Sequence, residues 1–360
     1  MECDFLIIGG GIAGVSAAAA LAPLGRVLLI EAEAQLAYHA SGRSAALFEP
    51  RYGNAAVVAL TAATGPHLRA VGDGGVLAPR GLMIVARPDE AAAFAADVAA
   101  MHLHPISPDE ACARVPALDR AAVAFAAAHD DAHDIDTDRL IQHLARTARA
   151  AGAELRTGAP LRALTRAGAH WQADAAGEGV RARIVVNAAG AWADRIALLA
   201  GVRPMGLVPH RRSIARIAAP GGHDTRGWPM LFGPGESWYA KPDAGALIVS
   251  PADEEPTEPH DVWPDEMVLA EGLARWQAVA RPAVTRPIAT WAGLRTFAPD
   301  RALVIGPDPA EPTFFWLAGQ GGYGFQTSLG AAALLRDRVA GVRPALDPAL
   351  VAALSPDRLR

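Results

Sequence analysis

Three glycines and one acid near the start of the chain have the spacing that dinucleotide binding needs. Gly9, Gly11 and Gly14 form a Gly-x-Gly-x-x-Gly turn, and Glu31 follows it. The first glycine permits a tight turn, the second lets the backbone approach a pyrophosphate, and the third lets a helix lie close to a strand. Glu31 is placed to accept hydrogen bonds from an adenosine ribose. The pattern predicts a dinucleotide site, and a glycine-rich turn in an ordinary α/β fold is the alternative.

The elements around this turn are those that such a site requires. Residues 4–8 predict a buried strand, residues 15–24 an alanine-rich helix, and residues 26–30 a second strand that ends at Glu31. The N-terminus of the helix would direct free N–H groups and a positive dipole end toward the phosphates. The order of strand, turn, helix and strand is typical of a dinucleotide-binding domain.

Composition limits the other classes of function. The 360 residues are enough for two domains, and a net charge of -5 gives no support for nucleic-acid binding. Residues 5–25 carry no charge over a length that could cross a bilayer, but their glycines and the following strand argue against a membrane helix. Acidic Glu2 and Asp4 are unlike a secretory signal, and Cys3 and Cys112 form no disulfide framework. We therefore expect a cytoplasmic protein without stable membrane insertion.

Two further segments contain side chains that could bind a charged group. Residues 38–46 form a loop of small and polar residues, which could wrap phosphates or simply connect elements at the surface. Residues 129–138 contain two histidines and five aspartates, but they lack the turn glycine and closing glutamate of hard-cation loops. We predict no metal site here, and we expect Asp136 or Thr137 to cap a helix over residues 138–151.

Two later strands also run into small residues, which allow close approach of the backbone to a ligand. Residues 180–186 lead into Asn187-Ala-Ala-Gly-Ala-Trp192, and residues 314–318 lead into a glycine-rich loop that precedes a helix over residues 326–339. Together with the first glycine turn and with Trp291-Ala-Gly-Leu-Arg295, these patterns resemble the FAD-dependent D-amino-acid oxidase superfamily over nearly the whole chain. The segments that are similar to its bacterial D-arginine dehydrogenase type are residues 38–46, 209–213, 241–245 and 320–327.

The resemblance implies an α/β fold (α+β overall). A Rossmann-like FAD-binding domain of the glutathione-reductase type would carry an inserted substrate domain with an antiparallel or mixed sheet. Residues 1–75, 138–205 and 291–360 would form the FAD-binding domain. Residues 76–137 and 206–290 would form the substrate domain.

The resemblance also implies how FAD is bound. The adenine half would lie along the glycine turn and Glu31, and the last helix would place its positive end beside flavin N1 and O2. Non-covalent FAD is favoured over a bond to His39, a position similar to a covalent histidine in relatives that demethylate glycine derivatives. The implied cofactor-binding residues are Gly9, Gly11, Ile12, Ala13, Gly14, Glu31, Ala32, Ser41, Arg43, Ser44, Ala45, Ala46, Pro160, Ala189, Gly190, Trp192, Gly321, Gly322, Tyr323, Gly324, Phe325 and Gln326.

An amino-acid substrate would bring a carboxylate, which a planar guanidinium binds with two parallel hydrogen bonds. By motif match the predicted pair is Arg212 and Arg295, because the adjacent Arg211 would face the other side of a strand. A cationic side chain would need a buried acid, but Leu82 stands where one is expected, and Glu49 has Arg51 close by. The implied substrate-binding residues are Arg212, Arg295, Tyr52, Tyr239, Met230, Leu82, Glu49 and Gly322.

The resemblance implies oxidative deamination of D-amino acids, and the residues favour neutral or apolar substrates, or a broad range of them. Hydride transfer from Cα to flavin N5 would give an imino acid, which hydrolyses to a 2-oxo acid and ammonia. No residue is assigned as a catalytic base, and the electron acceptor stays open. The alternatives are a glycine or sarcosine-type oxidase that produces peroxide and an FAD-dependent 2-hydroxy-acid oxidoreductase. An FAD-binding protein without activity would leave the arginines unexplained, and the C-terminal glycine loop disfavours an NAD-dependent dehydrogenase.

Overall fold

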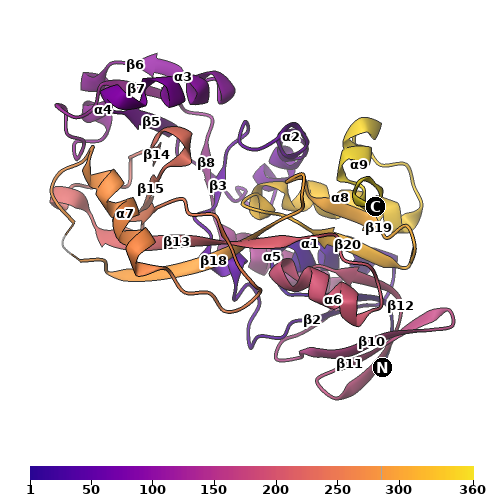
Figure 1. The fold of residues 1–360 in the computed structure, drawn as a ribbon. Helices are drawn as coiled ribbons and strands as arrows, with labels where there is room; N and C mark the ends of the chain where they lie inside the picture. The colour runs from indigo at the N-terminus through magenta and orange to yellow at the C-terminus, as the bar shows by residue number, and fades with distance from the viewer. Residues whose placement is uncertain (285) are drawn as a thin grey trace.

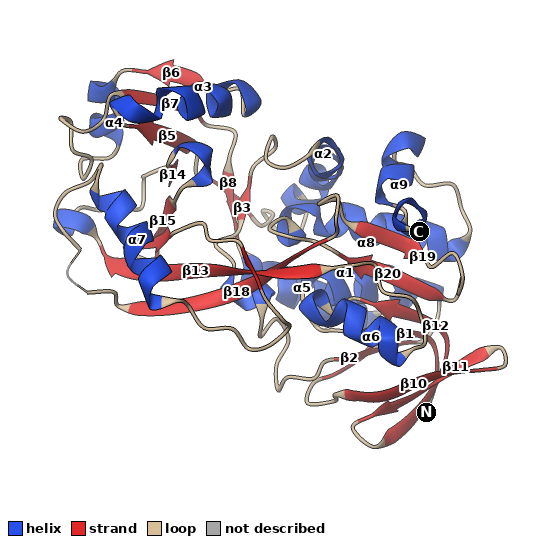
Figure 2. Cartoon of the chain, viewed as in Figure 1, coloured by secondary structure: helices blue, strands red, loops and turns tan. Residues whose placement is uncertain are grey.

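The computed structural model describes residues 1–284 and 286–360. The chain forms two large β-sheets and one small sheet, with helices packed around them (Figures 1 and 2). The first sheet holds both ends of the chain in one half of the molecule, and the second sheet forms most of the other half (Figure 1). This arrangement matches the predicted combination of a Rossmann-like sheet with a second, largely antiparallel sheet.

The first sheet is built around parallel strands that are buried on both faces. Phe5 and Ile7 belong to the apolar core on one side of the sheet, and Leu6 and Ile8 belong to the core on the other side. The predicted strands at residues 4–8 and 26–30 are therefore confirmed. In order across the sheet, the strands are β10 (Leu161–Ala167), β11 (His170–Ala175), β12 (Glu178–Asn187), β1 (Glu2–Ile8), β2 (Val27–Ile30) and β9 (Glu154–Arg156), with β20 (Phe314–Ala318) against β12 and β19 (Val304–Pro307) against β20.

Helices cover both faces of this sheet. The face that carries Phe5 packs against α1 (Ile12–Leu21), α5 (Thr137–Ala150) and α8 (Gly324–Ala340), and the other face packs against α6 (Ala193–Leu199). A Cβ on Gly14 would lie 1.8 Å from the carbonyl oxygen of Gly9, so α1 can approach the turn only because residue 14 is glycine. The predicted cap of α5 is confirmed, since the Asp136 side chain accepts from the N–H of Arg139 at 2.9 Å.

The second sheet carries two long antiparallel strands toward the first. The strands β13 and β18 pair from Val208 opposite Phe297 to Arg216 opposite Ala289, and Figure 1 shows them running between the two halves. The sequence-based division at residue 291 falls inside β18, which hydrogen-bonds to β13 of the second sheet. In order, the strands are β17 (Glu255–Pro256), β13 (Val208–Ala218), β16 (Ala246–Ser250), β15 (Tyr239–Asp243), β14 (Met230–Phe232), β5 (Leu82–Ala86), β7 (Phe125–His129) and β6 (His104–Ile106), with β18 (Ala289–Phe297) on β13.

The small sheet combines residues 47–48, which follow the loop over residues 38–46, with two strands from later in the chain. Its strands are β3 (Leu47–Phe48), β8 (His133–Ile135) and β4 (Leu77–Pro79). The remaining helices are α2 (Ala55–Arg69), α3 (Ala91–Ala100), α4 (Pro108–Arg114), α7 (Glu266–Gln277) and α9 (Pro348–Leu354). In the described part of the chain, no helix combines the length and apolar character needed to span a membrane.

Candidate functional site

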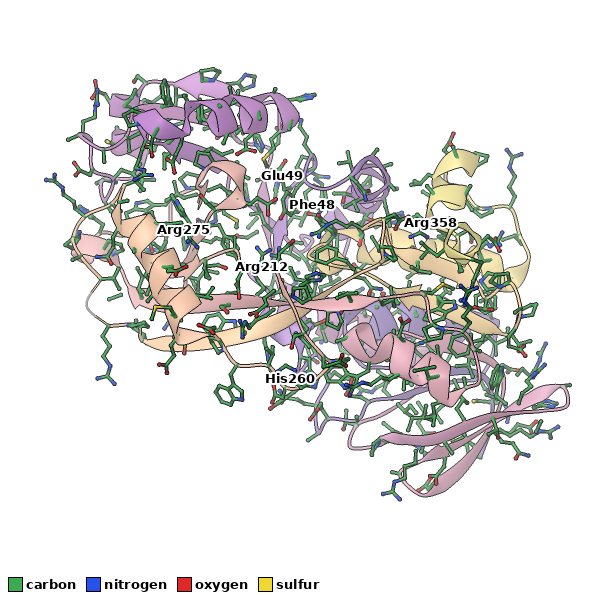
Figure 3. All side chains as sticks on the ribbon, viewed as in Figure 1. Phe48, Glu49, Arg212, His260, Arg275 and Arg358 are labelled. Carbon is green, nitrogen blue, oxygen red and sulfur yellow. The ribbon has the colours of Figure 1, made fainter. Side chains whose placement is uncertain are left out.

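A cavity of about 410 Å³ is lined by residues of both halves of the molecule. It reaches from Glu31, directly after β2, to Arg212 on β13 and Arg295 on β18. The ends of β1 and β12, the loop before β3 and the loop before α8 supply much of its wall, and Pro160, Tyr239 and Val262 line it as well. Figure 3 shows Arg212 between the two halves of the molecule. The cavity therefore joins the predicted cofactor and substrate segments in one continuous space.

The glycine-turn end of the cavity is held by backbone hydrogen bonds. Two backbone N–H groups donate to the carboxylate of Glu31, at 2.6 and 2.9 Å. The N–H of Ile12, at the start of α1, donates to Ser41 Oγ at 3.0 Å. A Cβ on Gly11 would lie 3.2 Å from the same oxygen, which is closer than most side chains allow. This end combines a fixed acid, a helix N-terminus and a glycine, which suits a ribose and its phosphates.

Arg43 is committed to protein partners although it lines the cavity. Its guanidinium donates to the backbone carbonyl of Ala292 at 3.0 Å and to Asp261 at 2.5 Å. Its own carbonyl accepts from the indole N–H of Trp291 at 3.2 Å. Arg43 thus ties the loop over residues 38–46 to β18 and to the segment before α7, which explains why this polar loop is ordered against the cavity.

His39 also lies on the cavity wall, with carboxylates beside both ring nitrogens. Its Nε2 is 2.9 Å from Glu33 and its Nδ1 is 4.0 Å from Asp261. The imidazole lies against the indole of Trp192, with ring centroids 4.6 Å apart. These contacts hold the imidazole of His39 in the cavity wall, and its position does not require a covalent bond to a cofactor.

Most of the residues predicted to bind the cofactor line this cavity. Gly14 instead packs α1 against the turn, and Gln326 is buried in α8, where it accepts from the N–H of Glu49 at 3.1 Å and donates to Thr61 at 3.1 Å. Ala46 and Tyr323 also lie off the wall. The predicted residues on the wall are Gly9, Gly11, Ile12, Ala13, Glu31, Ala32, Ser41, Arg43, Ser44, Ala45, Pro160, Ala189, Gly190, Trp192, Gly321, Gly322, Gly324 and Phe325.

Two arginines from neighbouring strands meet at the other end. Arg212 lies opposite Gly293 in the β13–β18 pairing, and Arg295 is two residues further along β18. Residues two apart on a strand share a face, so both guanidinium groups lie on the same side of the sheet. Arg211 faces the other side and pairs with Glu255. The strand register thus brings together the pair that was predicted.

Several buried polar atoms at this end have no hydrogen-bond partner within the described part of the chain. They are Nε and Nη1 of Arg212, the hydroxyl of Tyr239 and the hydroxyl of Thr296. The Arg212 side chain is only 5% exposed, and all three residues line the cavity. An unpaired buried polar group costs about 1–3 kcal/mol, so this arrangement is suited to a polar ligand that supplies the missing partners.

The charges around these atoms favour an anion. Burial and the neighbouring Arg295 cation lower the pKa of Arg212, although not enough for a guanidinium to lose its charge near neutral pH. Burial also disfavours the charged form of Arg295, but Tyr52, Tyr239 and Glu236 outweigh it and raise the pKa of Arg295. Arg212, with its unpaired N–H groups, and Arg295 on the same face of the sheet form a cradle for a carboxylate.

Three residues of this end were missed in the sequence. The hydroxyl of Tyr52 donates to Glu236 at 2.8 Å, and burial raises the pKa of this phenol. Glu254 accepts from Arg212 at 3.0 Å, and Thr296 lines the cavity beside Arg295. No local signal marks Glu236 or Glu254, because each meets its partner only through the fold.

The predicted side-chain residues lie behind the cavity wall. Met230 and Leu82 are opposite each other in neighbouring strands, and both are buried in an apolar cluster that contains Tyr239. The ring of Phe232 lies 6.5 Å from that of Tyr52 and 5.9 Å from that of Tyr239. This side of the site is apolar and aromatic, with Glu236 above Tyr52. Gly322 adjoins Arg295, whose guanidinium carbon would be 3.0 Å from an added Cβ.

Glu49 faces the protein interior and not the cavity. Its Oε2 lies 3.2 Å from Nε2 of His129, and both side chains are buried (Figure 3 labels Glu49). Nearby, Asp134 accepts from Lys241 at 2.9 Å. Through the pair of His129 with Glu49, residues 129–134 hold in place the segment that leads to Tyr52. Within residues 1–284 and 286–360, no cluster of three His, Cys, Asp or Glu side chains is arranged to hold a metal ion.

The residues on the wall fit FAD. The fixed carboxylate of Glu31 and the start of α1 lie at one end, and the first turn of α8 lies near the arginines. A Cβ on Gly190 would meet no atom within 4 Å, so this glycine borders open space. Glu31 and the start of α1 would hold the adenine half of FAD, and the residues near α8 would hold its flavin, which supplies the redox chemistry when bound.

Comparisons with solved structures find proteins of the same fold. The chain is similar to glycine oxidase from Geobacillus kaustophilus, with a TM-score of 0.83, 22% identity, and coverage of 97% of this chain and 98% of that one. It is similar to L-proline dehydrogenase from P. horikoshii, with a TM-score of 0.84, 21% identity, and coverage of 99% and 97%. These likenesses show the fold.

Sequence comparisons identify the family. The chain is 30% identical over 167 residues to FAD-dependent oxidoreductase domain-containing protein 1 from Bos taurus, an alignment that spans 41% of this chain and a third of that protein. Residues 4–338 match the DAO family, described as FAD dependent oxidoreductase. The chain therefore belongs to the DAO family of FAD-dependent oxidoreductases.

Proposed function

We propose that this protein oxidises D-amino acids to 2-oxo acids and ammonia. The observation that carries the proposal is the group of unpaired donors on Arg212 and Tyr239, beside Arg295, at the end of the cofactor cavity. An α-amino acid supplies the carboxylate that these groups lack. Glycine oxidase and L-proline dehydrogenase, which share the fold, are named for reactions on amino acids.

The residues of the chain would bind and orient the substrate. Arg212 and Arg295 would hold the carboxylate, and the hydroxyl of Tyr239 would donate a further hydrogen bond to it. Fixing one end in this way restricts where Cα can lie, and such positioning lowers the activation barrier. The bound flavin would accept the hydride equivalent from Cα. No side chain is assigned as a base, because a neutral substrate amine needs none.

The side-chain preference is inferred from the apolar residues that pack behind the cavity wall next to Tyr239. Leu82, Met230 and Phe232 are buried and uncharged, and Glu49 is turned toward His129. We therefore propose neutral or apolar side chains, or a broad range, over D-arginine itself. Glu236 is the residue that limits this proposal, because its carboxylate lies next to Tyr52 and could meet a cationic side chain.

A glycine-type amine oxidase is the second candidate, and the structural likeness to glycine oxidase favours it. This candidate would pass its electrons to oxygen and form peroxide. It would also accept substrates with little or no side chain, whereas the first candidate accepts larger neutral side chains.

The test is a substrate panel with the purified, flavin-loaded protein. D- and L-amino acids, glycine, sarcosine and 2-hydroxy acids are compared with an artificial electron acceptor, with 2-oxo acid and ammonia measured as products. An oxygen electrode records peroxide-forming turnover in parallel. We expect D-amino acids with neutral side chains to react fastest. Preference for L-amino acids, for 2-hydroxy acids, or for D-Arg and D-Lys would each overturn a stated part of the proposal.

A further inference from the structure

Three consecutive acids lie against three consecutive residues of β13. Asp253 accepts from the N–H and the hydroxyl of Ser213, at 2.6 and 2.8 Å. The next acid, Glu254, accepts from Arg212 at 3.0 Å, and Glu255 pairs with Arg211. The acids thus continue the antiparallel register of β17 with β13, in which Glu255 lies opposite Arg211.

The alternation of side chains divides these acids between two faces. Arg211 is approached by Asp253 and Glu255, at 3.6 Å for the first, on the face away from the cavity. Glu254 is the acid that follows Arg212 to the cavity side. Glu254 and Glu255 are neighbours of the same type, but they pair with arginines on opposite faces of β13.

Glu254 is itself fixed by a second cation. Both of its oxygens accept from Nη2 of Arg301, at 2.9 Å each. The Arg301 guanidinium lies 3.8 Å above the ring of Phe297, and Phe297 packs against Gly321 of the loop before α8. Glu254 thus connects Arg212 to the loop that borders the cofactor site.

Glu254 occupies one nitrogen of Arg212 and leaves two free. The bond from Arg212 Nη2 goes to Glu254, while Nε and Nη1 have no partner within the described residues. A guanidinium on a flexible stem would otherwise adopt several orientations, and each would have to be restricted when a ligand binds. One fixed hydrogen bond reduces this entropic cost before the ligand arrives.

We propose that Glu254 is a positioning residue for the carboxylate cradle, which it serves by holding Arg212 with Nε and Nη1 open. The inference rests on the proposed function, because it assumes that a substrate carboxylate binds there. Glu254 contacts neither substrate nor flavin in this role. It acts through Arg212, and it determines how strongly the site prefers a carboxylate over an uncharged group.

The test compares benzoate with benzamide, an uncharged analogue of similar size, as ligands of the flavin-loaded protein. Dissociation constants come from calorimetry or from the change in flavin absorbance. Wild type is expected to prefer benzoate. In E254A this preference should fall about tenfold, because one oriented, charge-assisted interaction is lost. E254Q keeps an acceptor oxygen and should fall between wild type and E254A.

The matched control is E255A, which removes the neighbouring acid on the other face and should leave the preference unchanged. General damage to the fold would weaken the binding of both ligands equally. It therefore cannot produce a change in the ratio of their dissociation constants. An E254A protein that keeps the wild-type preference, or binds benzoate more tightly, would overturn the inference while leaving the proposed function intact. If the wild-type protein shows no preference for benzoate, the site is not a carboxylate cradle, and the proposed function is contradicted as well.

Discussion

The two ends of the cavity are built in opposite ways. At the glycine turn, the polar groups already have partners in the protein, as Glu31 and Ser41 show. At the substrate end, Arg212 and Tyr239 keep buried polar atoms unpaired. On the proposed function, the first end would bind FAD through backbone groups and shape, and the second would bind the substrate through side chains that lack partners in the protein. The paired groups at the glycine turn stabilise the fold as they stand, whereas the unpaired groups at the substrate end cost stability until a ligand binds.

The largest effect is expected from a change that distorts the glycine-turn end. A Cβ on Gly14 would lie 1.8 Å from the Gly9 carbonyl oxygen, which is backbone and cannot move aside freely. Gly14→Ala should cost about 3 kcal/mol of stability, because such overpacking displaces α1 from the turn. We expect protein that is purified without stoichiometric flavin, as measured by the ratio of flavin to protein absorbance.

The matched control is Gly179→Ala, because an added Cβ at this β12 position meets nothing within 4 Å. This variant should bind flavin as wild type does. Full flavin occupancy and an unchanged melting temperature in Gly14→Ala would show that the turn tolerates a wider spacing than the structure indicates.

The next effect separates the two ends by removing a substrate-side cation. Arg295→Ala should retain flavin, because the glycine turn is untouched, but should lower kcat/KM for amino acids about 100-fold, equivalent to about 3 kcal/mol. The comparison variant is Arg211→Ala on the opposite face of β13, with its own acidic partners. Equal kinetics in the two variants would remove Arg295 from the site.

How much could be predicted from the sequence follows the same division. The glycine turn, α1 and Glu31 are close in the chain, so spacing alone predicts their arrangement. The helix α2 was not predicted, since Gly65 and Pro66 lie inside it and normally interrupt helices. Glu254 lies 42 residues from Arg212, and only strand register brings them together.

The choice between Arg211 and Arg212 illustrates the limit. Alternation along a strand states that the two face opposite sides, but it does not state which side is the cavity. The resemblance to a family supplied that choice. For Glu49, residue type suggested a substrate-binding acid, and only the position of His129 shows that its partner lies in the interior.

A smaller effect is expected at Tyr239, where one substitution should raise stability but weaken substrate binding. Its hydroxyl is buried without a partner in the described structure. Tyr239→Phe removes this unpaired group, so the free protein should gain about 1 kcal/mol of stability. The KM for the amino acid should rise about tenfold, because a hydrogen bond to the carboxylate is lost. Thermal unfolding and steady-state kinetics measure the two changes, and a loss in both would indicate a purely structural tyrosine.

The smallest effect concerns the segment before α7, which closes the cofactor end from outside. Asp261 pairs with Arg43 at 2.5 Å and accepts from Tyr38 at 3.3 Å, and the neighbouring Val262 lines the cavity. Asp261→Asn weakens this attachment, and since a partly exposed ion pair contributes about 0.2–1 kcal/mol, FAD release should accelerate about twofold to fivefold. Stopped-flow flavin fluorescence measures the release, with Glu258→Gln as the control on the same segment, because Glu258 pairs with Arg195 outside the cavity.

The pH dependence of this difference has a definite sign. Burial opposes the charged form of Asp261, but Arg43 and Tyr38 outweigh it and hold the pKa below the ordinary 3.8. The contribution of the carboxylate is therefore fully present above pH 3.8 and disappears as the pH falls through the lower pKa of the folded protein. Wild type and Asp261→Asn should differ throughout the range from pH 5 to pH 8 and should converge only in stronger acid. A difference that vanished near neutral pH would mean that Asp261 does not hold the segment closed.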